Sequence, residues 1–184
     1  MAERELETER LILRPPAPDD LPWVLEHMNT PAVVRYLGGE VRSPEEVAQS
    51  LADDIAAFGS GGHQRWTVWL RDGAARAGRV GLFHVRSPAA PPELQSKREI
   101  GWTFAEGFWG RGYATEAAQA VIAYAFGTLG LPVLWSQTSD SNESSTRMMQ
   151  RLGFTRRAEL DYVDPDYPPA DNPTTVWSMD APHG

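Results

Sequence analysis

Several short segments of the chain alternate apolar with polar residues, and this period of two predicts β-strands. The first covers residues 6–13, where leucines stand among charged residues, and Pro15 and Pro16 end it. Runs rich in β-branched and aromatic residues predict six more strands, at residues 66–70, 80–85, 98–104, 131–137, 154–160 and 174–179. Residues 71–79 are expected to form the turn of a hairpin between the second and third strands.

A period of 3.6 residues predicts helices between these strands. Asp19 and Asp20 precede apolar residues at helical spacing, and Ser43-Pro44 with two following glutamates opens a second helix with proline in its first turn. Residues 115–129 carry apolar side chains on one face, and residues 142–152 form the last helix. This order of elements predicts an α/β fold of the α+β kind, with an antiparallel front half.

Length and composition place the chain among ordinary globular proteins. With 184 residues, of which 41% are hydrophobic and 23% charged, it is long enough for one domain over residues 1–184 and short for two. No stretch approaches the roughly 20 apolar residues of a membrane span, and residues 1–10 are dense in charge where a signal peptide is apolar. We therefore expect a cytoplasmic protein with no membrane partner.

Charge and cysteine content exclude several kinds of chemistry. The chain has no cysteine, so disulfides and thiolate chemistry are excluded, and its four histidines show no ligand spacing, so no metal is expected. Acidic residues outnumber basic ones 25 to 17, and the formal charge of -8 argues against a nucleic-acid partner. An acidic surface suits a cationic substrate, but it is also common in proteins that merely stay soluble.

The most informative segment joins the strand at 98–104 to the helix at 115–129. Residues 109–117 read WGRGYATEA, a glycine turn that leads into a helix. Glycines let the backbone turn and expose successive amides, and the first turn of a helix adds unpaired N–H groups and the positive end of its dipole. A turn of this kind binds a pyrophosphate.

Two common phosphate loops do not fit this segment. A P-loop needs lysine followed by serine or threonine after its last glycine, whereas Tyr113 and Ala114 follow Gly112. A dinucleotide fold needs its glycines directly after the strand and a third glycine at position 115, where this chain has Thr115. A glycine turn without any ligand is the structural alternative.

The chain resembles the GNAT superfamily of N-acetyltransferases, and within it the branch of RimJ and RimL, which acetylate N-termini of ribosomal proteins. The resemblance runs through TERLILRP at residues 8–15, EIGW at 99–102, WGRGYATEA at 109–117, NESS at 142–145 and LGF at 152–154. It implies one mixed, mostly antiparallel sheet of about seven strands, flanked by about four helices and splayed in the middle to admit acyl-CoA. It also implies an acyltransferase that moves an acetyl group from its co-substrate acetyl-CoA to a primary amine.

The resemblance also implies which residues hold acetyl-CoA. Backbone amides of the glycine turn would bind its pyrophosphate, and the strand before the turn would bond the pantetheine arm like an added strand. One N–H of that strand would also stabilise the oxyanion formed when the amine attacks. The residues assigned to binding are Trp102, Thr103, Phe104, Trp109, Gly110, Arg111, Gly112, Tyr113, Ala114, Thr115, Asn142 and Ser145. For Asn142, a plain helix N-cap is the alternative.

An amine is mostly protonated at neutral pH, so a base must take a proton before the attack. Glu99 is the candidate, because it lies on the strand beside the acetyl group, where partial burial would raise its pKa toward working pH. Alternatively, Glu99 only pairs with Arg98 or Lys97. His84 is a weaker candidate, since a lone histidine is more often a packing residue.

A second catalytic role is to protonate the leaving thiolate. Many members of the superfamily use a tyrosine five residues before the phenylalanine of the Leu-Gly-Phe motif, but Met149 stands there in this chain. A serine at the position of Ser145 is common in the RimJ and RimL branch. Ser145, with Asn142 and a water, is therefore expected to do this work.

The amine acceptor stays open at this level. Residues 164–173 hold four prolines and, with Tyr162 and Tyr167, should border the amine site, which suits a protein N-terminus and a small-molecule amine equally. The proline-rich residues 87–96 form either a substrate lid or a solvated insertion. A non-catalytic acyl-CoA-binding module and an interaction domain are the competing classes, and the resemblance allows a homodimer.

Overall fold

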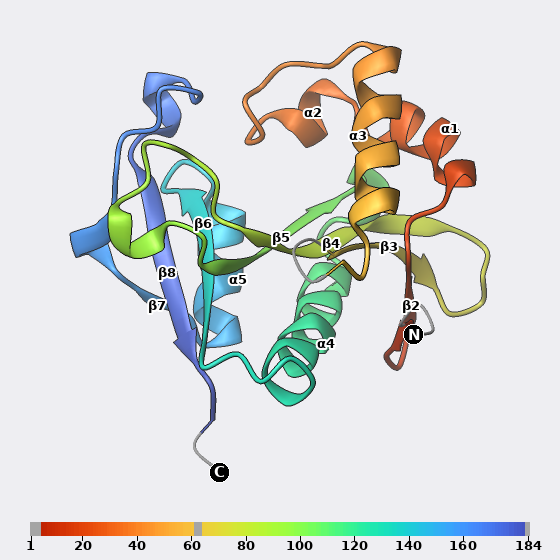
Figure 1. Cartoon of the computed structure of the whole chain (residues 1–184). Coiled ribbons are helices and arrows are strands. Elements are labelled where there is room, and N and C mark those ends of the chain that lie inside the picture. Colours follow the sequence, from red (N-terminus) through yellow and green to blue (C-terminus); the bar gives the residue numbers. More distant parts are fainter. Residues whose placement is uncertain (1–4, 61–63, 183–184) are drawn as a thin grey trace.

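The computed structural model describes residues 5–60 and 64–182, so residues 1–4 of the charged N-terminal segment lie outside the described part. Its centre is an eight-stranded sheet in the order β1-β2-β3-β4-β5-β6-β8-β7 (Figure 1). Neighbouring strands pair antiparallel except β5 and β6, which are parallel. The strands are β1 (Leu6–Glu7), β2 (Leu11–Arg14), β3 (Gln64–Leu70), β4 (Arg76–His84), β5 (Arg98–Phe104), β6 (Val133–Ser139), β7 (Thr155–Arg156) and β8 (Thr174–Asp180).

Helices lie on both sides of this sheet (Figure 1). The described ranges contain α1 (Leu21–Trp23), α2 (Pro31–Val34), α3 (Pro44–Ala57), α4 (Tyr113–Gly127) and α5 (Glu143–Leu152). Helix α4 packs against β4 and β5, whereas α1, α2 and α3 gather on the opposite side of the front half of the sheet. None of the described helices is both long and apolar enough to cross a membrane.

The mixed α/β class and the antiparallel front half are confirmed, with one strand and one helix more than the approximate numbers expected. The extra strand arises because the predicted strand at 6–13 is folded into a hairpin. The amide of Thr8 donates to the Leu11 carbonyl over 3.0 Å, and the amide of Leu11 donates to Thr8 Oγ1 over 3.0 Å. These two bonds reverse the chain between β1 and β2.

Two predicted boundaries were wrong for physical reasons. Strand β4 begins at Arg76 inside the expected turn, because the chain reverses over residues 71–75: the Gly73 amide donates to the Leu70 carbonyl over 2.8 Å and the Leu70 amide to the Ala75 carbonyl over 2.9 Å. The strand expected at 154–160 ends at Arg156. There the β8 amide of Val176 donates to Asp161 Oδ1 over 3.0 Å instead of extending the ladder, and the chain turns through Ala158–Leu160.

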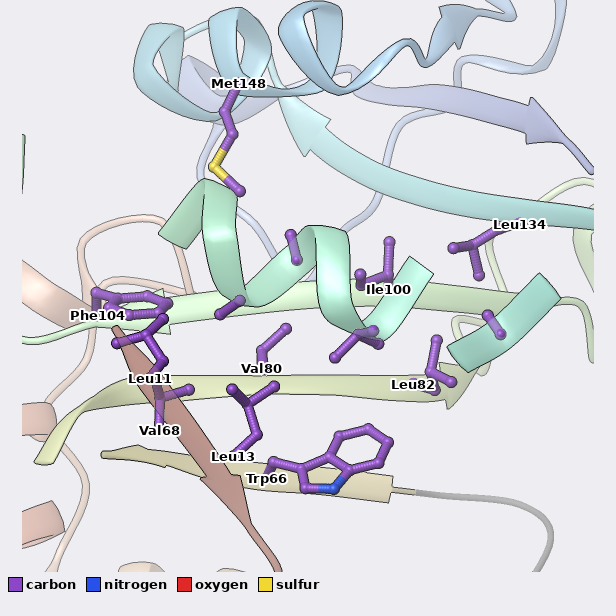
Figure 2. Packing of buried hydrophobic residues seen from close by; sticks show 14 of the residues in the cluster. Leu11, Leu13, Trp66, Val68, Val80, Leu82, Ile100, Phe104, Leu134 and Met148 are labelled. Carbon is purple, nitrogen blue, oxygen red and sulfur yellow. The ribbon is translucent and has the colours of Figure 1, made fainter. Parts of the chain in front are cut away.

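The main hydrophobic core lies between α4 and the sheet (Figure 2). The helix presents small residues, and Ala117, Ala118, Val121 and Ala125 are fully buried against leucines, valines and Trp66 of the strands. Small side chains let the helix approach the sheet closely, so the sheet buries its apolar positions on this face. The opposite face is covered in part by α3, which contacts β3, and the cleft lies over the rest of it.

Candidate active site

The sheet opens where β5 and β6 part. These parallel strands pair at one position, Glu99 with Trp135, and Ser136 Oγ donates to the Ile100 carbonyl over 2.9 Å. Beyond that point β6 stays paired with β8 along its whole length, while β5 stays paired with β4. The expected splay in the middle of the sheet is thus confirmed, and it exposes one backbone edge of β5.

A cleft of about 1090 Å³ occupies this opening and continues over the far face of the sheet. Its walls include the β5 residues Trp102, Thr103 and Phe104, all expected from the sequence to bind the pantetheine arm, and Asn142 and Ser145 across the splay. The indole Nε1 of Trp109 donates to the Phe104 carbonyl over 2.7 Å and so ties the glycine turn to the end of β5.

The glycine turn has the backbone that its sequence predicts. Gly110 and Gly112 have positive φ angles of 71° and 79°, and Gly112 caps the N-terminus of α4. The first intrahelical bond runs from the Glu116 amide to the Gly112 carbonyl, so the amides of Tyr113, Ala114 and Thr115 belong to the unpaired first turn. The Trp109 amide already donates to the Glu106 carbonyl, so the donors available to a ligand begin after it.

A second cavity of about 750 Å³ opens over this turn. It is lined by six of the seven expected phosphate-binding residues and by three arginines from outside the turn. Those residues are Trp109, Gly110, Gly112, Tyr113, Ala114 and Thr115 around the turn, with Arg10, Arg147 and Arg151 beside them. Arg111, also expected there, does not line it; its guanidinium lies 5.8 Å from the Phe108 ring.

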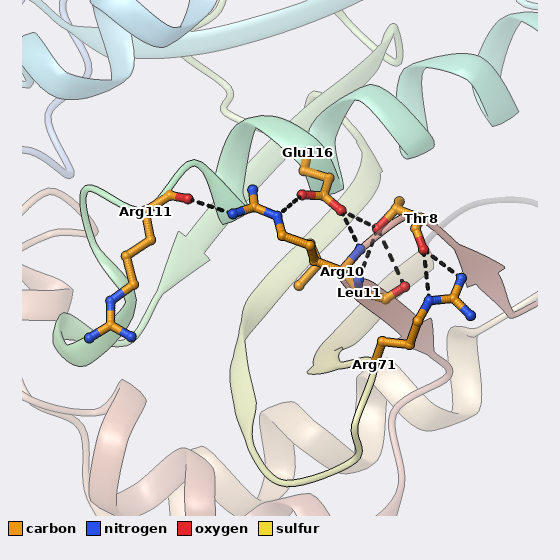
Figure 3. A network of polar contacts seen from close by, with 6 residues as sticks. All are labelled: Thr8, Arg10, Leu11, Arg71, Arg111 and Glu116. Atoms are coloured by element: carbon orange, nitrogen blue, oxygen red, sulfur yellow. Dashed lines mark hydrogen bonds and ion pairs between the residues drawn. The ribbon is translucent and has the colours of Figure 1, made fainter.

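The N-terminal strands hold the glycine turn in place through Glu116 (Figure 3). Arg10 Nε contacts Glu116 Oε2 at 2.6 Å, Thr8 Oγ1 donates to Glu116 Oε1 over 2.6 Å, and Arg10 Nη1 donates to the Arg111 carbonyl over 3.1 Å. Burial opposes ionisation of Glu116, but the hydrogen bonds from Thr8 and Arg10 outweigh it and lower the pKa of this carboxyl. The two sequence segments at 8–15 and 109–117 thus form one unit.

Glu99 lies in the wall of the cleft at the point where the strands part. Gln137 Nε2 donates to Glu99 Oε2 over 2.6 Å, and the Tyr162 hydroxyl donates to Gln137 Oε1 over 2.7 Å. Burial raises the pKa of Glu99, and the bond from Gln137 opposes that rise only in part. Among the ion pairs of residues 5–60 and 64–182, none includes Glu99, so pairing with Arg98 or Lys97 is not what holds it.

Sequence reasoning missed Gln137 and the part played by Tyr162 in orienting it. Burial raises the pKa of Tyr162 to about 12, so its hydroxyl remains a donor at working pH. The only signal in the sequence is that Gln137 closes a strand whose other residues are largely apolar.

The contacts of His84 do not suit a general base. Its Nδ1 lies 2.9 Å from the Ser96 carbonyl, which can only accept, so Nδ1 carries the proton. Its Nε2 then accepts from Arg98 Nη1 at 3.3 Å. With both ring nitrogens engaged, the histidine has no lone pair directed at a substrate.

Asn142 and Ser145 meet at the start of α5. Asn142 Oδ1 accepts from the Ser145 amide at 3.3 Å, which is the N-cap geometry weighed from the sequence, and both residues also line the cleft. Met149, which stands at the tyrosine position of the superfamily, is 1% exposed. Its side chain is part of the main core, so the described geometry gives it no acid role.

This arrangement was compared with known proteins. Residues 10–155 match a family model described as an acetyltransferase (GNAT) domain. The chain belongs to the GNAT acetyltransferases. It is therefore an acyltransferase, and the family uses acetyl-CoA as co-substrate.

Relatives cover almost the whole chain of this GNAT protein. The N-acetyltransferase YoaA of Bacillus subtilis (strain 168) is 31% identical over 179 residues, which span 96% of this chain and 97% of YoaA. An acetyltransferase structure from Agrobacterium tumefaciens is 33% identical, with a TM-score of 0.76 over 97% of this chain and 95% of its own.

A third match shows the fold alone. It is the Salmonella typhimurium acetyl transferase that modifies the N-terminal serine of ribosomal protein L7/L12, with 17% identity and a TM-score of 0.75. The match covers 96% of this GNAT chain and 99% of the other.

The residues of this structure fit the co-substrate of the family. The free edge of β5 offers backbone groups to the two amides of a pantetheine arm. The positive φ angles at Gly110 and Gly112, the open first turn of α4 and the three arginines offer donors and positive charge to phosphates.

Proposed function

We propose that this protein transfers the acetyl group of acetyl-CoA to a primary amine by direct attack in a ternary complex. The observation that carries the proposal is the half-buried carboxylate of Glu99, which Gln137 orients at the point where β5 and β6 part. It lies beside the only break in the sheet of the described residues, next to backbone groups suited to a thioester carbonyl. Glu99, the free edge of β5 and the glycine turn line two cavities that share lining residues.

The binding roles follow from these positions. Amides from Gly110 to Thr115 would hold the pyrophosphate, and the β5 edge at Trp102, Thr103 and Phe104 would hold the pantetheine arm. Asn142 and Ser145, across the splay, would lie beside the end of that arm. When bound, acetyl-CoA supplies an acetyl group activated as a thioester.

Two residues of this chain, Glu99 and Ser145, would transfer protons in the reaction. Glu99 takes a proton from the ammonium, so that the free amine can form the new C–N bond while the C–S bond breaks. A backbone N–H of β5 would donate to the carbonyl oxygen as charge develops on it. Ser145 would donate its hydroxyl proton to the leaving sulfur, because Met149 cannot. Ser145 would regain a proton, through water, from the nitrogen, which loses its second proton once the C–N bond has formed.

Two kinds of primary amine remain as acceptors within this proposal. The Salmonella relative is named for an N-terminal serine, which favours a protein N-terminus. The cleft favours a compact acceptor, because its far end is lined by side chains from α2, the segment before α3 and the loop at 164–173. A non-catalytic acyl-CoA-binding module is the second candidate function, because the buried Met149 stands at the position of the usual acid.

Thiol release tests the proposal directly. Purified protein with acetyl-CoA and a panel of amines, including serine-initiated peptides, amino acids and polyamines, is expected to release CoA only when an amine is present. Mass spectrometry should then find one acetyl group on the amine. CoA binding without transfer to any amine of the panel would favour the non-catalytic module.

Ser145→Ala is expected to lower kcat by about 10-fold, less than a typical loss of acid catalysis, because a thiolate is a good leaving group. Binding of acetyl-CoA should be nearly unchanged, since the Ser145 amide still donates to Asn142 Oδ1, which caps α5. Steady-state kinetics check this result. Ser60→Ala is the matched control, because Ser60 is exposed and outside both cavities. A kcat equal to the control's would remove Ser145 from the mechanism.

Gln137→Leu is expected to move the acid limb of the pH profile of kcat/KM to higher pH. The variant removes the donor that favours the charged form of Glu99, so the pKa of Glu99 rises further and more base is protonated at a given pH. Gln49→Leu is the control, because Gln49 also donates to a carboxylate, that of Asp53, but on the exposed side of α3. A limb that stays in place or moves to lower pH would contradict the assignment of Glu99.

A further inference from the structure

Three arginines line the far end of the cleft, on the sheet face opposite α4. Arg65 comes from β3, Arg79 from β4, and Arg42 from the segment before α3. Arg79 is 8% exposed, whereas Arg42 is exposed. Charged residues are almost never buried without a partner, so the groups around these guanidiniums indicate what the cleft is built to hold.

Within the described residues, Arg65 and Arg79 share one carboxylate oxygen. Arg79 Nη2 lies 2.6 Å and Arg65 Nη1 3.2 Å from Asp54 Oδ2, and Asp54 itself is buried on α3. The Nε of Arg79 is buried and has no hydrogen-bond partner. A buried N–H of a charged group without an acceptor is costly, so the free energy of the site would improve if a ligand supplied one.

Among the ion pairs of the described residues, one carboxylate, that of Asp54, serves both Arg65 and Arg79. Burial lowers the pKa of Arg65 to about 10, and repulsion by Arg79 and Arg42 adds to that effect, while Asp54 opposes it. Arg42 lines the same cleft as Arg65 and Arg79, so a ligand in the cleft can meet all three side chains. A carboxylate placed among them would offset the repulsion and accept the free Nε–H of Arg79.

The strand register places this cluster close to Glu99. Arg65 pairs with Gly81 and Gly81 with Gly101, while Phe83 pairs with Glu99. The Phe83 ring covers both glycines, since a Cβ added at Gly81 would come within 2.5 Å of it and one at Gly101 within 3.4 Å.

The Arg65 guanidinium lies 4.8 Å from the centroid of that Phe83 ring. Two strand spacings of about 5 Å and one step of about 7 Å along the strand put the Cα atoms of Arg65 and Glu99 about 12 Å apart. The Arg65 guanidinium lies over Phe83, the residue that pairs with Glu99, so it extends toward Glu99 across this distance. A compact molecule can therefore reach both.

We propose that the amine acceptor carries a carboxylate a few bonds from its amine, which Arg65, Arg42 and the Nε of Arg79 bind while the amine lies at Glu99. The proposal rests on the acetyl transfer proposed above and names the substrate class. The carboxylate is either the acceptor's own α-carboxylate, as in a free amino acid, or the acidic side chain of an N-terminal residue. Glu99 would bind the ammonium and the arginines would bind the carboxylate, so the charges of the cleft complement those of a zwitterion.

The test uses three products of nearly equal shape, so that only the carboxylate differs. N-acetylglutamine has an α-carboxylate, N-acetylglutamate α-amide has a side-chain carboxylate, and N-acetylglutamine amide has neither. Thermal shift and calorimetric titration of the full chain, without acetyl-CoA, are expected to show binding of one carboxylate compound and at least 10-fold weaker binding of the diamide. Which compound binds distinguishes the two sources.

Two variants separate a ligand role from a structural one. Arg42→Gln changes an exposed residue, and Arg65→Gln leaves the shorter contact of Arg79 to Asp54 in place. Both variants are expected to weaken binding of the carboxylate compound about 10- to 100-fold and to leave binding of the diamide unchanged. Arg157→Gln is the matched control, because Arg157 is half-exposed, pairs with Glu159 and lies outside both cavities.

The outcomes distinguish this proposal from the proposed function. Equal binding of all three compounds, or no binding of any, would overturn the carboxylate site even if acetyl transfer to other amines is found. Carboxylate binding that both variants abolish would support the carboxylate site, whether or not acetyl transfer is detected. Such binding without any transfer would contradict the proposed acetyltransferase function and leave the carboxylate site standing. If the two variants weaken binding of the carboxylate compound and of the diamide equally, the arginines have a structural role alone, and the proposal is overturned.

Discussion

Glu99→Gln is expected to lower kcat by about 100- to 10,000-fold, the range usually found for loss of a general base. Glutamine keeps the shape of the side chain but cannot take a proton from the ammonium. The acid limb that Glu99 gives the pH profile of kcat/KM should disappear with it. The affinity for acetyl-CoA should stay nearly unchanged, because in the proposed complex the Glu99 side chain contacts the amine.

The stability of Glu99→Gln distinguishes lost chemistry from misfolding. Burial raises the folded-state pKa of Glu99 above its unfolded value, so the stability contributed by the protonated form is lost as pH rises through the folded pKa. Glutamine removes this cost, and the melting temperature at neutral pH should equal or exceed that of the wild type.

Glu93→Gln, at an exposed position of the 87–96 loop, is the control for Glu99→Gln. A Glu99→Gln variant with a melting temperature at or above the wild type and an unchanged kcat would show that another group, or solvent, takes the proton.

Gly112→Val is expected to raise the KM and Kd for acetyl-CoA by at least 10-fold. Gly112 has a φ of 79°, where a residue with a Cβ is strained by about 1–2 kcal/mol, and a Cβ there would come within 3.4 Å of Arg10 Nη2. Relief of that strain turns the amides of the loop away from the position a pyrophosphate would take. Isothermal titration with CoA measures the loss.

Gly73→Val is the matched control for strain. Gly73 has a φ of 72° in the turn between β3 and β4, with no atom near its added Cβ, and it lines neither cavity. It should lose similar stability but bind CoA as the wild type does. Equal affinities for the two variants would contradict the assignment of the glycine turn to the pyrophosphate.

The sequence predicts well the elements whose local signals agree. The strand at 98–104 matches β5 at both ends, because its apolar alternation and the turn residues after it point the same way. The helix after the glycine turn begins at Tyr113 rather than 115, because Gly112 in the left-handed conformation already serves as its cap. Apolar periodicity alone does not register such a cap.

The candidate site is predicted in part. The glycine turn and Glu99 are visible because backbone chemistry and a carboxyl beside it leave a local pattern. Gln137 and Arg65 are not, since each acts through residues far away in the chain: Gln137 through Glu99 and Tyr162, and Arg65 through Asp54 and Phe83. Their chemistry exists only once the strands are aligned, which periodicity does not specify.

Whether the splay between β5 and β6 is the acetyl-CoA site is tested most directly by titrating the wild-type protein with acetyl-CoA while its melting temperature is measured. Binding to the folded state alone must stabilise it, by about 2.7 kcal/mol at 100 times the dissociation constant. A saturable rise in melting temperature that Gly73→Val retains and Gly112→Val loses is the predicted result. No rise at millimolar acetyl-CoA, or an equal rise in both variants, would contradict it.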